Sequence, residues 1–426
     1  MKRIIAYICL AAMISSTPGG ETPAPLSQPL PEAGLSLSQA VSIVLASHPE
    51  LEALRLQAGA AGAGREQAAT LPDPMLSFGL MDRTNAGSDW ADAGEKRITV
   101  EQKIPWFGKR DLRRQIADRE YESTAHALTA LALRLQRETK EVFYSLYAVR
   151  CTLSVTRDDE QVLQRIADLA EALYATGKRS QSDFFRAEAE KTVLRQTLIE
   201  LEAQEAVLGS RLNVLMNRAP EHPVDTLLPP PEWPVQATLP ADLREAAGTR
   251  PNVLAALARS AKYGHQAELA QKEFWPDPVL GVEYRGNRSG GDMLMLMVGF
   301  DLPIWRSSLQ AGVRQAGLLR QANLAEARAA AQENALQIEA ARIALQAARR
   351  TLELYRKELM PQAEAGFQAG EAGYRNGQVT FTELLENRRI LLATRIKIIA
   401  TEGETGRLAA RLEEAAGVLP TSEQGE

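Results

Sequence analysis

Two patterns of apolar and polar positions alternate along the chain. Over most of its length apolar residues recur three or four positions apart, as in the series Leu194, Leu198, Leu201, Leu208, Leu212 and Leu215. This spacing predicts amphipathic helices that pack as coiled coils. In two short regions every second residue is apolar, which predicts strands at about residues 74–83, 96–104, 278–285 and 293–302. Because aromatic residues make up only 5% of the chain, we expect a mostly α fold with a small β part.

The chain also repeats itself at a spacing of roughly 200 residues. Landmarks recur in the same order: Leu71-Pro72-Asp73-Pro74 with Trp275-Pro276-Asp277-Pro278, Ile104-Pro105 with Leu302-Pro303, and Tyr174-Ala175-Thr176-Gly177 with Tyr374-Arg375-Asn376-Gly377. The predicted organisation is a first structural repeat at residues 25–220, a proline-rich linker at 221–240, a second repeat at 241–420 and a tail at 421–426.

Each repeat has the same predicted plan of helix, two strands and helical hairpin. The first helix is expected at 35–70 and again at 241–274, and it ends where proline removes an amide donor and disfavours helix in the preceding residue. The hairpins are expected at 108–217 and 307–416. Each has a long helical run, 108–175 or 307–374, followed by a turn and a helix of about half that length. A run of about 68 residues spans about 100 Å, so one long helix can lie beside two short helices stacked end to end.

The N-terminus has the layout of a secretory signal peptide. Lys2 and Arg3 precede a short apolar run, and small residues follow, so we expect a signal segment at residues 1–24 with an uncertain cleavage site. Cys9 leaves lipidation open as an alternative. If the segment is removed, Cys151 is the only cysteine left, and we interpret it as a helical packing residue in preference to a reactive thiol.

The predicted strands have one apolar face and one mixed face. Leu76, Phe78 and Leu80 alternate with Met75, Ser77 and Gly79, and the other three strands alternate in the same way. Half-buried soluble sheets share this pattern, but Trp106, Trp275 and Trp305 stand at the proline-marked strand ends, like the aromatic girdle of a membrane barrel. Four strands cannot close a barrel alone, so membrane insertion would require several copies to share one barrel.

These landmarks together resemble the TolC-like outer-membrane efflux family. The resemblance is carried by residues 71–74, by Gln102-Lys103-Ile104-Pro105-Trp106-Phe107-Gly108-Lys109-Arg110, and by the turn segments 174–184 and 374–384. It covers about residues 35–418. It implies a homotrimer in the outer membrane that extends into the periplasm, with an α-barrel tunnel joined to a shared twelve-stranded transmembrane β-barrel.

The resemblance further implies partners and functional positions. Such a duct passively conducts substrate from a periplasmic adaptor and an inner-membrane pump, here one of the proton-driven resistance-nodulation-division type. Gly177, Gly377 and Val379 match the adaptor-contacting tips. Asp183, Glu383 and Glu386 match an acidic periplasmic gate, although this chain has Glu where the family usually has Asp. The alternative is that these acids only stabilise helix N-termini.

The cargo is less constrained. The Gly108-Lys109-Arg110 motif resembles the heavy-metal branch of the family, and methionines fall on the mixed face of the predicted sheet: Met75, Met81, Met293, Met295 and Met297. Thioether sulfur is a soft ligand suited to Cu(I). The alternative is that these methionines fill a crowded interior.

Other classes of function have little support. The four histidines are scattered without paired ligand spacing, so we expect neither an enzyme nor a cofactor. A net charge of −5 gives no reason to expect nucleic acid. The remaining alternative is a periplasmic coiled-coil adaptor, which would have one helical hairpin where this chain has two hairpins and four amphipathic strands.

Overall fold

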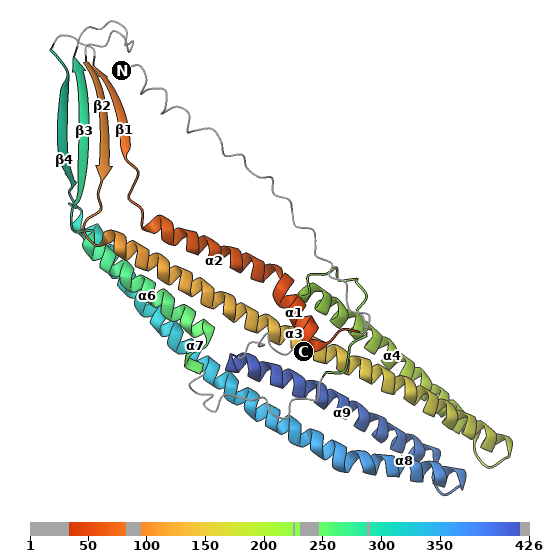
Figure 1. The fold of residues 1–426 in the computed structure, drawn as a ribbon. Coiled ribbons are helices and arrows are strands. Elements are labelled where there is room, and N and C mark those ends of the chain that lie inside the picture. Colours follow the sequence, from red (N-terminus) through yellow and green to blue (C-terminus); the bar gives the residue numbers. More distant parts are fainter. Residues whose placement is uncertain (1–33, 82–94, 225, 231–246, 288–289, 418–426) are drawn as a thin grey trace, which may run out of the picture.

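The computed structural model describes residues 34–81, 95–224, 226–230, 247–287 and 290–417. The molecule is elongated, with a sheet at one end and, at the other, two turns that each connect a pair of helices (Figure 1). Helices run between the two ends. The mostly helical fold with a small sheet agrees with the prediction. The expected signal segment at 1–24, part of the linker at 221–240 and the tail at 421–426 lie outside the described residues.

The sheet joins the two halves of the chain. It contains β1 (Met75–Met81), β2 (Glu95–Lys103), β3 (Asp277–Asn287) and β4 (Met293–Asp301), in the order β1-β2-β3-β4 with every pair antiparallel. The pairing of β2 with β3 links the first half to the second. The outer strands, β1 and β4, pair with no further strand among the described residues, so the sheet has two open edges.

The helices follow the same order in both halves. The first half contains α1 (Leu37–Ser47), α2 (Pro49–Ala68), α3 (Lys109–Ala175) and α4 (Gln181–Leu215). The second contains α6 (Pro251–Lys272), α7 (Arg306–Leu354), the π-helical turn η2 (Tyr355–Leu359), α8 (Met360–Arg375) and α9 (Phe381–Ala416).

The prediction of one unbroken helix at 35–70 is wrong, because the chain bends between α1 and α2. His48 is extended, with φ −68° and ψ 127°, since the following Pro49 disfavours helical geometry at the residue before it. Arg250 is extended for the same reason before Pro251, and α6 begins there. Residues 241–246 of the second predicted helix lie outside the described chain.

The second long run, at 307–374, is also interrupted. Pro361 lacks an amide donor, and one turn before it the helix widens into η2, where the Met360 amide donates to the Tyr355 carbonyl five residues earlier. No corresponding turn interrupts α3, which is helical over 67 residues. The two long runs therefore differ in local geometry.

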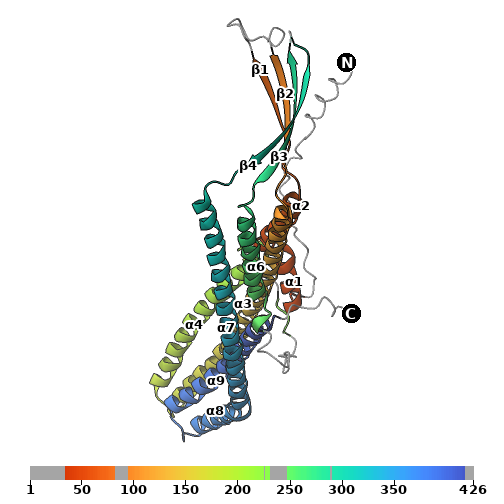
Figure 2. The same ribbon diagram turned by 90° about the vertical axis from the view of Figure 1, so that its left-hand side faces the viewer.

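The helices form a layer in which neighbours lie side by side. Near the sheet the order is α2-α3-α6-α7, and near the turns it is α4-α3-α9 followed by α7 and α8. Thus α3 lies along both α2 and α4, as the helix lengths predict. Figure 2 shows α4 and α8 on opposite sides of the lower part, with α3 and α9 between them. The layer, like the sheet, has one edge from the first half and one from the second.

Four apolar clusters in the described part of the chain hold this layer together, and the two largest lie at mid-height and near the turns. One surrounds Phe143, Leu146 and Leu212 at mid-height and includes Leu35 and the linker residue Leu227, which form an isolated parallel bridge. The other lies near the turns and contains Leu163, Ile166, Tyr374, Phe381 and Leu384. Among the described residues, no helix is both long and apolar enough to cross a membrane.

Candidate functional site

The far end of the molecule consists of two turns with the same hydrogen-bond pattern. In the first, the Lys178 amide donates to the Leu173 carbonyl and the Gly177 amide to the Tyr174 carbonyl, at 2.9 and 2.8 Å. The second turn repeats both bonds 200 residues later, through Gln378 and Gly377. Gly177 and Gly377 adopt φ of 72° and 80°, which side chains disfavour. We name these segments, residues 174–180 and 374–380, the tip turns.

A hydrogen-bonded network joins the two tip turns. The hydroxyl of Tyr374, on α8, donates to Asp183 Oδ2 on α4 at 3.0 Å, and both residues are buried. Arg179 places its guanidinium 4.6 Å from the centre of the Tyr374 ring and donates to the carbonyls of Tyr374 and Val379, at 3.2 and 2.7 Å. Burial, together with the bond to Asp183, raises the pKa of the Tyr374 hydroxyl, so it remains a donor at neutral pH. Tyr374 and Arg179 were not predicted as site residues, since only the tertiary structure brings them together.

The three predicted gate acids have different surroundings. The Asp183 carboxylate accepts the hydrogen bond from the Tyr374 hydroxyl. Glu383 accepts from the amide and hydroxyl of Thr380, at 2.8 and 2.9 Å, and this capping holds the pKa of Glu383 below its usual range. The Glu386 side chain is 60% exposed, with Arg389 at 3.8 Å. Glu383 and Glu386 are both exposed, and of the three acids Asp183 and Glu383 also stabilise the tip turns.

The predicted adaptor-contacting residues lie at the extreme end. Gly177 and Gly377 are exposed at the two turns. Val379 is half-buried, and a side chain at Gly373 would place its Cβ 2.5 Å from Val379 Cγ2. Gly373 therefore makes room for the second turn to fold back on α8.

A buried ion cluster joins the two hairpins farther from the turns. Arg388 on α9 is 3% exposed and lies 3.3 Å from Asp159 on α3 and 3.7 Å from Glu190 on α4. Arg388 Nε and Nη1 and Asp159 Oδ2 nevertheless have no hydrogen-bond partner. Burial raises the pKa of the Asp159 carboxyl, while the charges of Arg388 and Arg395 oppose that shift. The cluster is paired by charge but incompletely hydrogen-bonded.

The sheet has two chemically distinct faces. Rows such as Leu76, Val100, Val282 and Leu296 run across all four strands on one face. The other face has charges on its central strands: Glu283 contacts Arg285 at 2.7 Å and Arg97 at 3.3 Å, and Glu95 contacts Arg285 at 3.0 Å. The methionines lie on the two edge strands. Met75 of β1 lies opposite Glu101 of β2, and Met293, Met295 and Met297 alternate along β4. The side chain of Met81 is outside the described part of the structure.

The sheet meets the helices through an aromatic and ionic junction. The rings of Trp106 and Trp275 stack with their centres 5.6 Å apart, while Trp305 is 76% exposed. Beside them the buried Lys109 ammonium donates to Asp277 Oδ1 at 2.6 Å and to the Trp275 carbonyl at 3.1 Å. Lys109 thus ties the start of α3 to the start of β3, a role not predicted from its motif.

The remaining candidate chemistry is sparse. Cys151 is half-buried, and burial raises the pKa of its thiol, which disfavours the reactive thiolate. Within the described ranges, no group of three His, Cys, Asp or Glu side chains is placed to hold a metal ion.

The chain is similar in sequence to a family of outer membrane efflux proteins and in fold to solved outer-membrane proteins. Residues 40–217 and 243–418 match the family model described as outer membrane efflux protein. The fold is similar to that of the outer membrane protein VceC from Vibrio cholerae, with 17% identity and a TM-score of 0.74 over 89% of this chain and 96% of that one. No curated protein sequence matches significantly.

Two further solved structures have the same fold. The outer-membrane channel OprN is 19% identical, with a TM-score of 0.78 over 89% of each chain. The open state of the MtrE outer membrane channel of Neisseria gonorrhoeae is 16% identical, with a TM-score of 0.75 over 89% of this chain and 88% of that one.

We predict that Tyr374→Phe loosens both tip turns. The change removes the hydrogen bond to Asp183, and losing a bond to a charged group costs about 1.5–3 kcal/mol. Amide hydrogen exchange across residues 173–186 and 374–384 should become faster by about tenfold or more. The control is Tyr174→Phe, the equivalent change at a residue that is 46% exposed; equal effects of the two changes would contradict the prediction.

We predict that Arg388→Met lowers the thermal stability of the helical region. It leaves the Asp159 carboxylate buried without its nearest cation, which should lower the free energy of unfolding by about 3 kcal/mol. The double change Asp159→Asn with Arg388→Met should recover much of this loss, because it removes both buried charges. Denaturation followed by circular dichroism measures the effect, and additive losses in the double variant would show that the two charges do not interact.

Proposed function

Because the chain belongs to the outer membrane efflux protein family, we propose that it is the outer-membrane duct of a tripartite efflux system. Its substrate would pass from a periplasmic adaptor and an inner-membrane pump to the exterior. The observation that carries the proposal is the single layer with two open edges, continuous from sheet to tip turns. Family membership also argues against the alternative of a periplasmic adaptor.

The two edges support a closed ring of identical copies. One edge consists of β1, α2 and α4, and the other of β4, α7 and α8. Because these surfaces differ, contact between copies would be heterologous, and such contacts close into rings when the rotation allows. Both edges expose large apolar side chains: Phe185, Val193, Ile199, Val207 and Val214 on α4, and Leu318, Leu336, Ile343 and Leu354 on α7.

Three copies would supply twelve strands, as the family resemblance implies. A closed barrel satisfies the backbone groups of β1 and β4, which lipid cannot do. The apolar row with Leu76, Val100, Val282 and Leu296 would then face the outer membrane, and the charged face would line the lumen. Trp106, Trp275 and Trp305 would lie at the periplasmic membrane interface. The helices would extend into the periplasm.

The tip turns would then form the periplasmic gate and the adaptor contact. We propose that the Tyr374–Asp183 bond keeps the two hairpins together, and that Glu383 and Glu386 add acidic groups near the constriction. Gly177, Gly377 and Val379 would meet the adaptor. The inner-membrane partner would be a proton-driven pump of the resistance-nodulation-division type, as the resemblance implies.

We further propose soft metal ions as cargo. The specific observation is that these methionines lie on the edge strands β1 and β4. In the proposed ring those strands would adjoin the neighbouring copy, and the methionines would face the lumen. In the isolated chain Met75 and Met293 are 58% and 54% exposed. Thioethers in such a position suit Cu(I) or Ag(I), in agreement with the resemblance to the heavy-metal branch.

We predict that Val207→Glu or Leu336→Glu, one on each edge, prevents ring formation. Each change would bury a carboxylate in an apolar contact. The wild type should fractionate with the outer membrane as a heat-sensitive trimer on denaturing gels, and each variant should run as a monomer. Ile390→Glu, on α9 between the edges, is the control and should leave the trimer intact. A monomeric wild type in the periplasm would contradict the proposal.

We predict that replacing Met75, Met293, Met295 and Met297 by leucine lowers copper and silver tolerance in cells that depend on this duct. Leucine conserves volume but removes the thioether ligand. Met216→Leu, in the mid-height core, is the control. Unchanged tolerance with normal trimer content would show that the methionines only fill space.

A further inference from the structure

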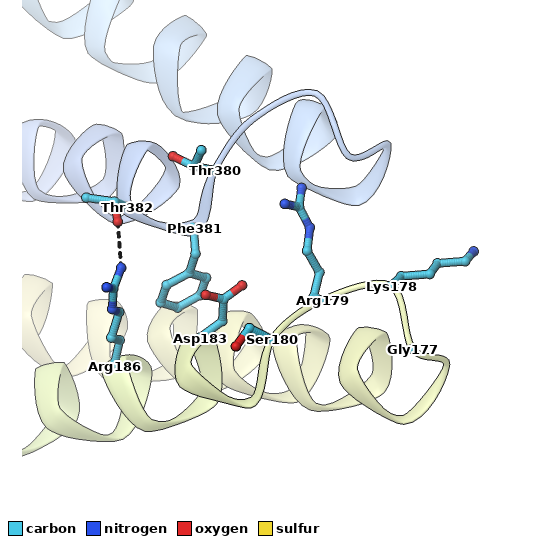
Figure 3. Close-up of a pocket in the computed structure, with 9 residues that line it drawn as sticks. All are labelled: Gly177, Lys178, Arg179, Ser180, Asp183, Arg186, Thr380, Phe381 and Thr382. Atoms are coloured by element: carbon cyan, nitrogen blue, oxygen red, sulfur yellow. Dashed lines mark hydrogen bonds between the residues drawn. The ribbon is translucent and has the colours of Figure 1, made fainter.

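A groove of about 540 Å³ lies between the first tip turn and the start of α9. Figure 3 shows its walls: Arg179, Asp183 and Arg186 come from the first hairpin, and Thr380, Phe381 and Thr382 from the second. Lys178 extends outward from the turn at its rim. The groove is therefore formed by both hairpins.

The groove has an excess of positive charge. Lys178, Arg179 and Arg186 line it, and Asp183 is the acid among its lining residues. Asp183 is buried and accepts the hydroxyl of Tyr374. Arg179 donates to two backbone carbonyls, and Arg186 Nη1 donates to Thr382 Oγ1 at 2.8 Å. Within the described chain, none of the three cations forms an ion pair with a carboxylate.

Several cations farther along the same helices are paired with carboxylates. Arg195 contacts Glu160 at 3.0 Å, Lys191 contacts Glu188 at 3.0 Å, and Arg389 pairs with Glu190. Even at the second tip turn, Arg375 contacts Glu371 at 2.5 Å. The groove therefore gathers three cations without a carboxylate partner among the described residues, at the end of the molecule farthest from the sheet (Figure 1).

We propose that this groove receives an acidic side chain at the hairpin end of the periplasmic adaptor. The inference rests on the proposed function, because only a partner that approaches the tip turns end-on would reach the groove. A carboxylate there would accept from the fork of Arg186 and from the hydroxyls of Ser180 or Thr382, while Lys178 attracts it from the rim. Complementary charge of this kind increases the association rate and fixes the register of two surfaces.

The same contact would couple docking to the gate. Arg186 bridges α4 to Thr382 of α9, so it connects the two hairpins through a neutral acceptor. A carboxylate is the stronger acceptor for a guanidinium, and an incoming one would draw Arg186 from Thr382. Docking would then remove a link between the hairpins near Tyr374 and Asp183, so that the adaptor binds the loosened tip more tightly than the closed one.

The test uses the full-length protein in nanodiscs and the purified adaptor whose gene neighbours that of this chain. Binding is measured at several salt concentrations for the wild type and for Lys178→Gln with Arg186→Gln. We expect the double variant to bind about tenfold more weakly, with a smaller salt dependence. The matched control is Arg195→Gln, which removes a cation farther along α4 that already has a carboxylate partner, Glu160, and its affinity should be close to that of the wild type.

Two outcomes would overturn the proposal. One is a double variant with the affinity and salt dependence of the wild type. The other is an equal loss of affinity in Arg195→Gln, which would show that the net charge of the protein, and not the groove, determines binding. Trimer content and single-channel conductance of the same samples report on the duct itself. Failure of the wild type to form channels would reject the proposed function, whereas normal channels with unchanged binding reject only the acidic contact.

Discussion

The outer edges of β1 and β4, which pair with no further strand in the described part of the chain, are the constraint on which the rest of the architecture depends. In lipid, the backbone amides and carbonyls along the two edges of a four-stranded sheet would have no hydrogen-bond partners. In this duplicated chain one edge strand, β1, comes from the first half and the other, β4, from the second. The helical layer is divided in the same way: α2 and α4 form its edge in the first half of the chain, as β1 does in the sheet, and α7 and α8 form its edge in the second half, as β4 does. A contact between copies that satisfies the sheet therefore also brings together the apolar edges of the helices.

Within one copy, polar groups link the two hairpins where apolar packing alone would leave them free to slide. The apolar cluster around Leu163 and Phe381 stabilises the contact between the hairpins, but hydrophobic packing is not directional and does not by itself fix their relative position. Tyr374 with Asp183, and Arg388 with Asp159 and Glu190, define how the second hairpin sits on the first. Because the Arg388 cluster lacks several hydrogen bonds, it favours one arrangement without making that arrangement strongly stable.

The sequence predicts the mostly helical fold and the small sheet, because both depend on local periodicity. Period-two alternation also assigns residues such as Leu76 and Met75 to opposite faces. Interruptions within a helix are harder to predict. Pro72 and Pro276 end their helices in a Pro-Asp-Pro element, whereas at Pro49 and Pro361 the apolar spacing continues across the break. The partners of Asp183 and Lys109 could not be predicted, since Tyr374 and Asp277 are far away in the chain and only tertiary packing brings them close. The equivalent tyrosines were visible as a repeat landmark, but nothing local distinguishes the buried Tyr374 from the exposed Tyr174.

The π-helical turn η2 makes the two long arms mechanically unequal. It lies some 15–20 residues from the second tip turn, a lever of roughly 30 Å at 1.5 Å per residue, whereas α3 has no such interruption. A bend of only 10° at that point would carry the turn sideways by about 5 Å. In a ring of three copies, three stiff arms would then alternate with three that bend, and the aperture would change through every second hairpin.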